Sequence, residues 1–198
     1  FYMTMTHPKN EKTLIIIKPD GVQRNLIGEI VSRFERAGLK LVAMKMITAD
    51  VEMIKKHYTL DSEWMRLVGE KSIKGLLDKG VEPISRDPMI VAQSVIDRLS
   101  IYLTSGPIIP IVLQGGHAVS VVRKIVGSTE PVMSDVGTIR GDYVLDSYIM
   151  AMNDERCVRN LIHASGTVSE AINEINLWFK NDEIVDYVLA NESVIYGV

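Results

Sequence analysis

The chain has 198 residues and a formal net charge of −3 at pH 7, with 46% hydrophobic and 24% charged residues. This length suits one domain or two small ones, and the composition is that of a globular protein with a buried core, which excludes a large multidomain assembly and a disordered chain. The slightly acidic balance argues against a generic basic surface for nucleic acid, so any anion site must be built locally.

The first part of the chain predicts a strand, a helix and a second strand. Residues 13–18 form a short β-branched run that ends at a Pro-Asp-Gly turn, which is typical of a buried strand. Apolar residues from 26 to 34 recur at helical spacing, and Gly38 supplies a stop signal. Residues 39–44 then alternate in the manner of a strand with one well-buried face.

Helical patterns dominate the rest of the chain. Further helices are predicted over 50–58, 88–103, 117–126 and 167 to about 179. The last of them begins with a Thr-x-x-Glu capping box formed by Thr167 and Glu170. A third strong strand is predicted at 108–113, after a Gly-Pro turn.

Three segments carry no single period. Residues 60–87 mix charges with glycine and proline breakers, which indicates an inserted segment of helices and loops. Residues 127–141 form a long polar loop of a kind that is usually functional in a compact domain. Residues 143–159 are expected to hold a short strand or helix. The whole pattern predicts one α+β domain, a small sheet with helices packed on a face.

The cysteine content and the length of the apolar runs indicate where in the cell the protein is expected. The single cysteine, Cys157, cannot form an intrachain disulfide, so a reducing, cytoplasmic location is expected. The longest apolar runs, at 14–17 and 108–113, fall short of the roughly 20 residues that a membrane span needs. No membrane partner is therefore expected.

A phosphate site, if there is one, must be made of side chains. The two common backbone cradles for nucleotide phosphate, G-x-x-x-x-G-K-[ST] and G-x-G-x-x-G, do not occur in the sequence. The candidates are cationic and polar residues at a strand end, around the 127–141 loop and beside a histidine: Lys18, Arg123, Thr129, Arg140 and Asn160. Taken singly, each arginine is more often a solvated surface charge.

His163 has the most suggestive surroundings of the histidines, because it lies in an apolar flank just before the helix that Thr167 caps. A helix N-terminus attracts anions, and a neutral imidazole can act as a nucleophile when a carboxylate holds its far nitrogen. Glu174, one turn beyond Glu170, could reach back to it. On these features alone, a core histidine bonded to the backbone is the more frequent case. The other histidines are interpreted as ordinary residues: His7, His57 and His117.

Several separate blocks together resemble the nucleoside diphosphate kinase family. The blocks are KPDGVQRNLIGEIVSRFERAGLKLVAMK at 18–45, HY at 57–58, LTSGPIIPIVLQG at 103–115, GTIRGD at 137–142 and NLIHASGTVSEAINEINLWF at 160–179. The resemblance covers nearly all of residues 12–198, so residues 1–11 are expected to be an N-terminal extension. Two stretches are longer than is usual in the family, which predicts insertions at about 60–94 and 143–157.

The resemblance implies a ferredoxin-like βαββαβ sandwich with helical insertions, and an enzyme that transfers the γ-phosphate of a nucleoside triphosphate such as ATP to a nucleoside diphosphate. It implies ping-pong kinetics through a phosphohistidine, which would maintain nucleoside triphosphate pools. The implied cofactor is Mg²⁺, held through the nucleotide phosphates and not by protein ligands. A homo-oligomer, either a hexamer or a tetramer built from dimers, is implied as well.

The resemblance also assigns roles to residues. It makes His163 the nucleophile and Glu174 its orienting carboxylate, with Ser165 and Tyr58 completing the catalytic group. It places the nucleotide-phosphate and ribose contacts at Lys18, Arg123, Thr129, Arg140 and Asn160. Gly166 stands where the family commonly has aspartate, which affects the hydrogen bonding of that loop.

The base-binding part of the pattern departs from the family. Its stacking aromatic falls near Val95, and the opposite apolar contact falls near Cys157. Trp64 could substitute for the aromatic platform, although a core tryptophan is the simpler interpretation. Two other functions stay open, namely a catalytically weak nucleotide-binding module of the same fold and a nucleic-acid-binding protein, which the net charge disfavours.

Overall fold

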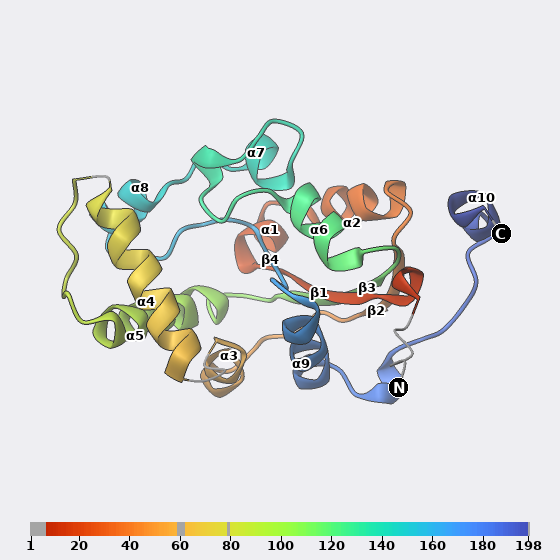
Figure 1. Cartoon of the computed structure of the whole chain (residues 1–198), viewed down its shortest axis with the longest axis horizontal. Coiled ribbons are helices and arrows are strands. Elements are labelled where there is room, and N and C mark those ends of the chain that lie inside the picture. The colour runs from red at the N-terminus through yellow and green to blue at the C-terminus, as the bar shows by residue number, and fades with distance from the viewer. Residues whose placement is uncertain (1–6, 59–61, 79, 198) are drawn as a thin grey trace, which may run out of the picture.

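The computed structural model describes residues 7–58, 62–78 and 80–197. These residues form a four-stranded antiparallel sheet in the order β2-β3-β1-β4, with helices on both of its faces (Figure 1). The strands are β1 (Lys12–Ile17), β2 (Lys40–Met44), β3 (Ile109–Gln114) and β4 (Ile162–Ala164). The predicted ferredoxin-like α+β fold is thereby confirmed, and the predicted strands at 13–18, 39–44 and 108–113 each fall within one residue of the observed ones.

β1 is an inner strand of the sheet, and both of its faces are buried. Leu14 and Ile16 belong to one hydrophobic cluster and Ile15 and Ile17 to another, and all four side chains are fully buried. Alternate side chains of a strand point to opposite faces, so a continuous apolar run needs helices on both sides. The sheet therefore carries two helical layers, where the sequence pattern predicted one.

The helices lie close to their predicted ranges. The longer ones are α2 (Ile27–Arg36), α3 (Val51–Tyr58), α4 (Ser62–Leu77), α5 (Pro88–Leu103), α6 (Ala118–Val126) and α9 (Val168–Trp178). The shorter ones are α1 (Pro19–Gln23), α7 (Ile139–Tyr143), α8 (Tyr148–Asn153) and α10 (Glu192–Tyr196). Helices α2 and α6 cover one face of the sheet, and α3, α5 and α9 pack on the other (Figure 1).

Two weakly patterned segments turn out to be helical. Most of 60–87 is the 16-residue helix α4, which packs along α5, and the stretch 143–159 contains α8. The side chain of Trp64, for which the sequence offers a base-stacking or a core role, lies outside the described part of the structure. Domain limits and insertions stay predictions.

The capping box at the start of α9 forms only in part. Thr167 Oγ1 accepts a hydrogen bond from the backbone N–H of Glu170 at 3.1 Å, as predicted. The Glu170 carboxylate, however, accepts from Gly166 N–H at 2.9 Å, one residue before the cap. The turn between β4 and α9 is therefore closed by Glu170 directly, and a glycine at 166 suits this closure because a Cβ there would lie 2.6 Å from the carboxylate.

The contact between α4 and α5 gives a stability prediction. A Cβ added to Gly69 would lie 1.9 Å from the carbonyl oxygen of Pro88, whereas one added to Gly75 on the same helix meets nothing within 4 Å. We expect Gly69→Ala to destabilise the fold by about 2 kcal/mol through overpacking. The matched Gly75→Ala should stabilise it by up to ~1 kcal/mol, because alanine favours helix. Urea unfolding of both variants checks the opposite signs, and equal effects would contradict the close helix contact.

Candidate active site

His163 lies at the middle of β4, opposite Ile16 of β1, so its side chain emerges on the face that α3 and α9 cover. Its ring is partly buried, with 16% of the side chain exposed. The Nε2 atom of His163 lies 3.0 Å from Oε1 of Glu174, which projects from α9. The predicted pair is thus brought together by two elements that are adjacent in the chain.

The Glu174 carboxylate is held from several sides. Its Oε2 accepts a hydrogen bond from Ser165 Oγ at 2.5 Å, and Ser165 is itself fully buried and accepts from the backbone N–H of Leu14 at 3.2 Å. Burial alone would raise the pKa of Glu174, but His163, His57 and Ser165 together bring it below its ordinary value. Because an ionised carboxylate can only accept, Glu174 accepts a hydrogen bond from Nε2–H of His163, and in that tautomer Nδ1 carries the lone pair.

A second group gathers beside this pair at the ends of β1 and β4. Lys18 Nζ donates to Asn160 Oδ1 at 2.7 Å, and Asn160 Nδ2 donates to the carbonyl of Thr129 at 2.9 Å. Lys18 and Asn160 are buried, while Thr129 is exposed. Three of the predicted phosphate-site residues are therefore linked in one chain of hydrogen bonds.

Arg140, the fourth, is a buried strut between two loops. Its guanidinium donates to the carbonyls of Gly127 and Ser128 at 3.1 and 3.0 Å and to those of Asn160 and Ile162 at 3.1 and 2.5 Å. Burial lowers the pKa of Arg140 to about 10, and it remains charged at neutral pH. The side chain thus fixes the positions of both loops that border the site in addition to supplying charge.

The backbone conformation of Leu161 allows the carbonyls of Asn160 and Ile162 both to accept from the Arg140 guanidinium. A φ of 63° places this buried leucine in the left-handed region, which branched and bulky side chains rarely adopt. Its N–H donates to Asp20 Oδ2 at 3.2 Å, and its carbonyl accepts from Lys18 N at 2.8 Å. The kink leaves the carbonyls of Asn160 and Ile162 on either side of it, and both accept from Arg140.

The remaining predicted residues lie around these two groups. Tyr58 on α3 is buried, with its ring 6.0 Å from that of His163, and burial raises its pKa. Arg123 on α6 is exposed and close enough to lower the pKa of Arg140. Cys157 lies near Lys18 and has its pKa raised by burial. These residues thus approach the site from α3, α6 and the segment before β4.

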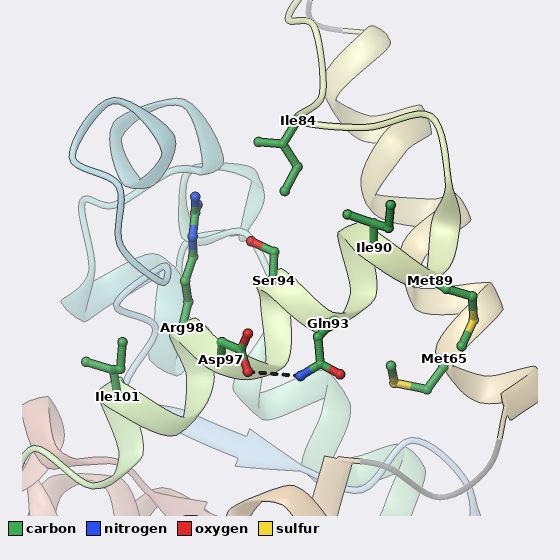
Figure 2. A pocket seen from close by; sticks show the side chains of 9 residues that line it. All are labelled: Met65, Ile84, Met89, Ile90, Gln93, Ser94, Asp97, Arg98 and Ile101. Atoms are coloured by element: carbon green, nitrogen blue, oxygen red, sulfur yellow. Dashed lines mark hydrogen bonds between the residues drawn. The ribbon is translucent and has the colours of Figure 1, made fainter.

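Val95 is half-buried on α5, and its neighbours line a pocket of 690 Å³ on the outer side of that helix. Ser94, Asp97 and Arg98 line this pocket together with apolar side chains, and Val95 is not among the lining residues (Figure 2). Arg98 is also close enough to Cys157 to lower the pKa of its thiol. The structure thus places Arg98 near Cys157, the other predicted base contact.

His57, interpreted from the sequence as an ordinary histidine, lies beside the predicted nucleophile. Its side chain is fully buried, and its ring lies 4.5 Å from the ring of His163 and 5.7 Å from that of Trp178. Sequence reasoning also missed Asp20, whose carboxylate accepts hydrogen bonds from Tyr102 Oη at 2.5 Å and from Leu161 N–H. The block HY at 57–58 is the one signal that could have found His57, because it sets the histidine next to a predicted site residue.

Lys18 gives this site a distinct pH dependence. Burial lowers its pKa from 10.5 to about 8, with Arg140 and Arg159 acting in the same direction and Cys157 and Asp20 opposing them. We expect kcat/KM to fall above about pH 8, because it reports ionisations of the free enzyme and Lys18 then loses its charge. Stability changes the opposite way: the unfolded chain binds more protons between about pH 8 and 10.5, so folding becomes more favourable as the pH rises through that window.

Kinetics and urea unfolding across this range check the two opposite trends. Lys18→Arg is the matched variant, since a guanidinium stays charged and should remove the alkaline fall. A wild-type kcat/KM that stays level well above pH 8 would contradict the assignment.

A histidine held by an ionised carboxylate, beside buried cations at the edge of an α+β sheet, is an arrangement that suits a phosphotransferase acting on an anionic substrate. Within the described ranges, no helix is both long and apolar enough to cross a membrane. The sequence profile of the nucleoside diphosphate kinase family matches residues 11–67 and 90–184. The chain belongs to this family, and it is an enzyme that transfers a phosphoryl group between nucleotides.

Relatives agree along nearly the whole chain. A nucleoside diphosphate kinase of Pyrobaculum aerophilum is 47% identical over 180 residues, which are 89% of this chain and 98% of the relative. The crystal structure of an NDP kinase from the same organism has a TM-score of 0.86 at 45% identity, covering 89% of this chain and all of that one.

Two further solved structures contain ligands. The enzyme of Borrelia burgdorferi with bound vanadate and ADP has a TM-score of 0.76 at 36% identity, covering 93% of this chain and 95% of that one. The enzyme of Halobacterium salinarum in complex with CDP has a TM-score of 0.69 at 32% identity, covering 94% and 99%.

Proposed function

We propose that the enzyme works by a ping-pong mechanism in which His163 carries the phosphoryl group. The observation that supports this most directly is the 3.0 Å contact from His163 Nε2 to Glu174 Oε1, because it leaves the lone pair on Nδ1. In the first step, Nδ1 forms a bond to the γ-phosphorus of a nucleoside triphosphate such as ATP, and the bond to the β–γ bridging oxygen breaks. The nucleoside diphosphate leaves with that electron pair.

The second step reverses the first with another nucleotide. A terminal oxygen of the incoming diphosphate attacks the phosphorus, the P–N bond breaks, and its electron pair returns to Nδ1 of His163. No proton transfer is required, since Nε2 keeps its proton against Glu174 throughout. The positive charge that develops on the ring is balanced by that carboxylate, which Ser165 holds in place.

Negative charge on the phosphoryl group in transfer would be stabilised by the cationic side chains of the site. Lys18, Arg123 and Arg140 would face the phosphates, with Thr129 and Asn160 as polar contacts and the Tyr58 hydroxyl beside the nucleophile. A metaphosphate-like group needs positioning and positive charge more than covalent help, which suits this set. Val95 and Cys157 remain the predicted base contacts, and Arg98 lies near the second of them.

Mg²⁺ is the proposed cofactor, and the carboxylates of the site fit an ion held through the nucleotide phosphates. Glu174 is engaged by His163 and Ser165, and Asp20 by Tyr102 and Leu161 N–H, so neither has an oxygen dedicated to a metal. Mg²⁺ in such enzymes would neutralise charge on the transferring phosphates. Lys18 and Arg140 would hold the phosphates to which it binds.

Substrates and assembly follow from the relatives and the family. The bound ADP and CDP of two relatives support nucleoside diphosphates with different bases as substrates. We also propose a homo-oligomer, a hexamer or a tetramer of dimers, in the cytoplasm. Exposed Val132, Met133 and Val136 in the loop before α7 support an interface there, since they are 63%, 67% and 93% exposed in the single chain.

The test is single-turnover labelling with γ-labelled ATP and Mg²⁺. The protein should acquire an acid-labile, alkali-stable label in an amount that approaches one per chain. Added unlabelled CDP or GDP should discharge it as labelled triphosphate within the dead time of manual mixing. Label that never forms, or that forms and cannot be discharged by any diphosphate, would refute the mechanism.

A further inference from the structure

His57 is a buried titratable residue that the proposed mechanism does not use. It lies on α3, and its Nδ1 accepts a hydrogen bond from the indole Nε1–H of Trp178 at 3.0 Å. Among the described residues, its buried Nε2 has no hydrogen-bond partner. That atom lies 3.7 Å from Oε1 of Glu174, the oxygen that also contacts His163.

The contact with Trp178 fixes the tautomer of His57. An indole N–H can only donate, so Nδ1 must carry the lone pair and the proton of the neutral ring must reside on Nε2. Burial, and to a lesser degree the proximity of His163, lower the pKa of His57 to about 3, so the ring is neutral at physiological pH. His57 therefore presents an uncharged Nε2–H toward the Glu174 carboxylate.

A metal ion is the alternative occupant of this cluster. One ligand atom each of His57, His163 and Glu174 lie within 4.8 Å of one another. A metal-bound histidine, however, directs its lone pair at the ion and donates its other N–H to a neighbour. His57 has the opposite arrangement, because its lone pair is already used by Trp178. The chemistry of the donors thus favours an N–H aimed at a carboxylate over a metal centre.

We propose that His57 is a positioning residue that sets the charge state of Glu174, with Trp178 holding its Nε2–H toward Oε1. This inference rests on the proposed role of Glu174. The groups that face the carboxylate are His163 from β4, Ser165 from the turn after it and His57 from α3. His163 and Ser165 lie at hydrogen-bond distance from Glu174. His57 lies farther away, at 3.7 Å, and has no contact with the substrate in the proposed mechanism. Its effect is therefore electrostatic, and it lowers the pH at which Glu174 becomes protonated.

Tyr58 and Lys18 are the other titratable groups near the cluster. Tyr58 is kept neutral by burial, which raises its pKa, and Lys18 acts on His57 by lowering its pKa. Neither group changes charge in the acidic range where Glu174 titrates. A shift of the acidic limb of activity can thus be assigned to the cluster of His57, His163 and Glu174, in which the His57 variants change only the first member.

Two substitutions of His57 separate its two nitrogens. In His57→Asn, the side-chain amide can still accept from Trp178 but places no donor at the Nε2 position. In His57→Gln, an amide N–H reaches the Nε2 position. We expect the asparagine variant to move the acidic limb of the rate of His163 phosphorylation upward by about one pH unit and to lower the rate about 10-fold at neutral pH. The glutamine variant should retain the wild-type limb.

His117→Asn is the matched control, because His117 is exposed and its φ of 53° is one that asparagine tolerates. If the wild type is labelled and the asparagine and glutamine variants share the wild-type limb, the proposal is wrong. If the wild type is never labelled, the proposed function has failed instead.

Nuclear magnetic resonance of the unmodified enzyme supplies a readout that needs no variant. The imidazole nitrogen shifts of His57 should show a protonated Nε2 and an unprotonated Nδ1, unchanged when Zn²⁺ is added. The reverse tautomer, or shifts that move with Zn²⁺ in proportion to bound metal, would overturn the proposal and favour the metal centre.

Discussion

Replacing His163 by alanine is expected to lower phosphoryl transfer by at least ~10⁴-fold, the largest effect of any single substitution in this chain. The variant loses the covalent carrier, and the direct transfer between two nucleotides would require both to occupy one site together. The fold should persist, because β4 keeps its backbone pairing with β1 and the ring is only partly buried. Steady-state exchange between ATP and a second diphosphate measures the rate.

The control is His117→Ala, which removes an exposed imidazole from the turn before α6. It should retain full activity. A His163→Ala protein that is folded by circular dichroism and still exchanges phosphate within 10-fold of wild type would mean that another residue carries the phosphoryl group.

Replacing Arg140 by alanine is expected to have the second largest effect, and to act on both rate and stability. Four backbone carbonyls lose their donor, two of them on the loop at 127–128 and two beside Leu161. Stranded buried acceptors cost about 1–3 kcal/mol each, although the exposed loop can turn to water, so we expect a loss of ~3 kcal/mol or more. Activity should fall by at least ~100-fold, through lost charge and through movement of Thr129 and Asn160.

Arg140→Lys is the conservative variant for this experiment, and Arg86→Ala is the control. Lysine keeps the charge but cannot donate to four carbonyls at once, so it should recover part of the activity and little of the stability. Arg86 is an exposed arginine whose ion pair is with Glu82, and its loss should change neither quantity measurably. If Arg140→Ala melted at the wild-type temperature, the strut role of the guanidinium would be wrong.

The sheet could be predicted from the sequence because its strands are short β-branched runs between strong turn signals. The helix predicted over 88–103 has the observed bounds, because its helical pattern begins at Pro88 and ends just before a Gly-Pro turn. Helix α4 could not be predicted as one element. Gly69 and Gly75 read as breakers, yet Gly69 is required by the crossing of α5 and Gly75 lies in open space.

Proximity within the site could be predicted for residues on elements that are neighbours in the sequence, where the spacing along a helix or strand is fixed. Glu174 could be paired with His163 from its spacing along α9 and the position of β4. His57 could not, because its approach depends on the packing of α3 against α9 through Trp178, which no local pattern records. Leu161 was missed for a related reason. Its left-handed backbone contradicts the preference of leucine and is imposed by Asp20 and Lys18, which are some 140 positions away.

The pairing of β4 with β1 also has a consequence for how the enzyme comes into being. β4 contributes three residues to the edge of the sheet, and the hydrogen bond between Leu14 and Ser165 closes a loop of 151 residues. Such distant pairings form late, after the entropy of a long loop has been overcome. A nascent chain therefore cannot anchor its nucleophile until β4 has been synthesised, and catalytic competence depends on a contact between an early and a late strand.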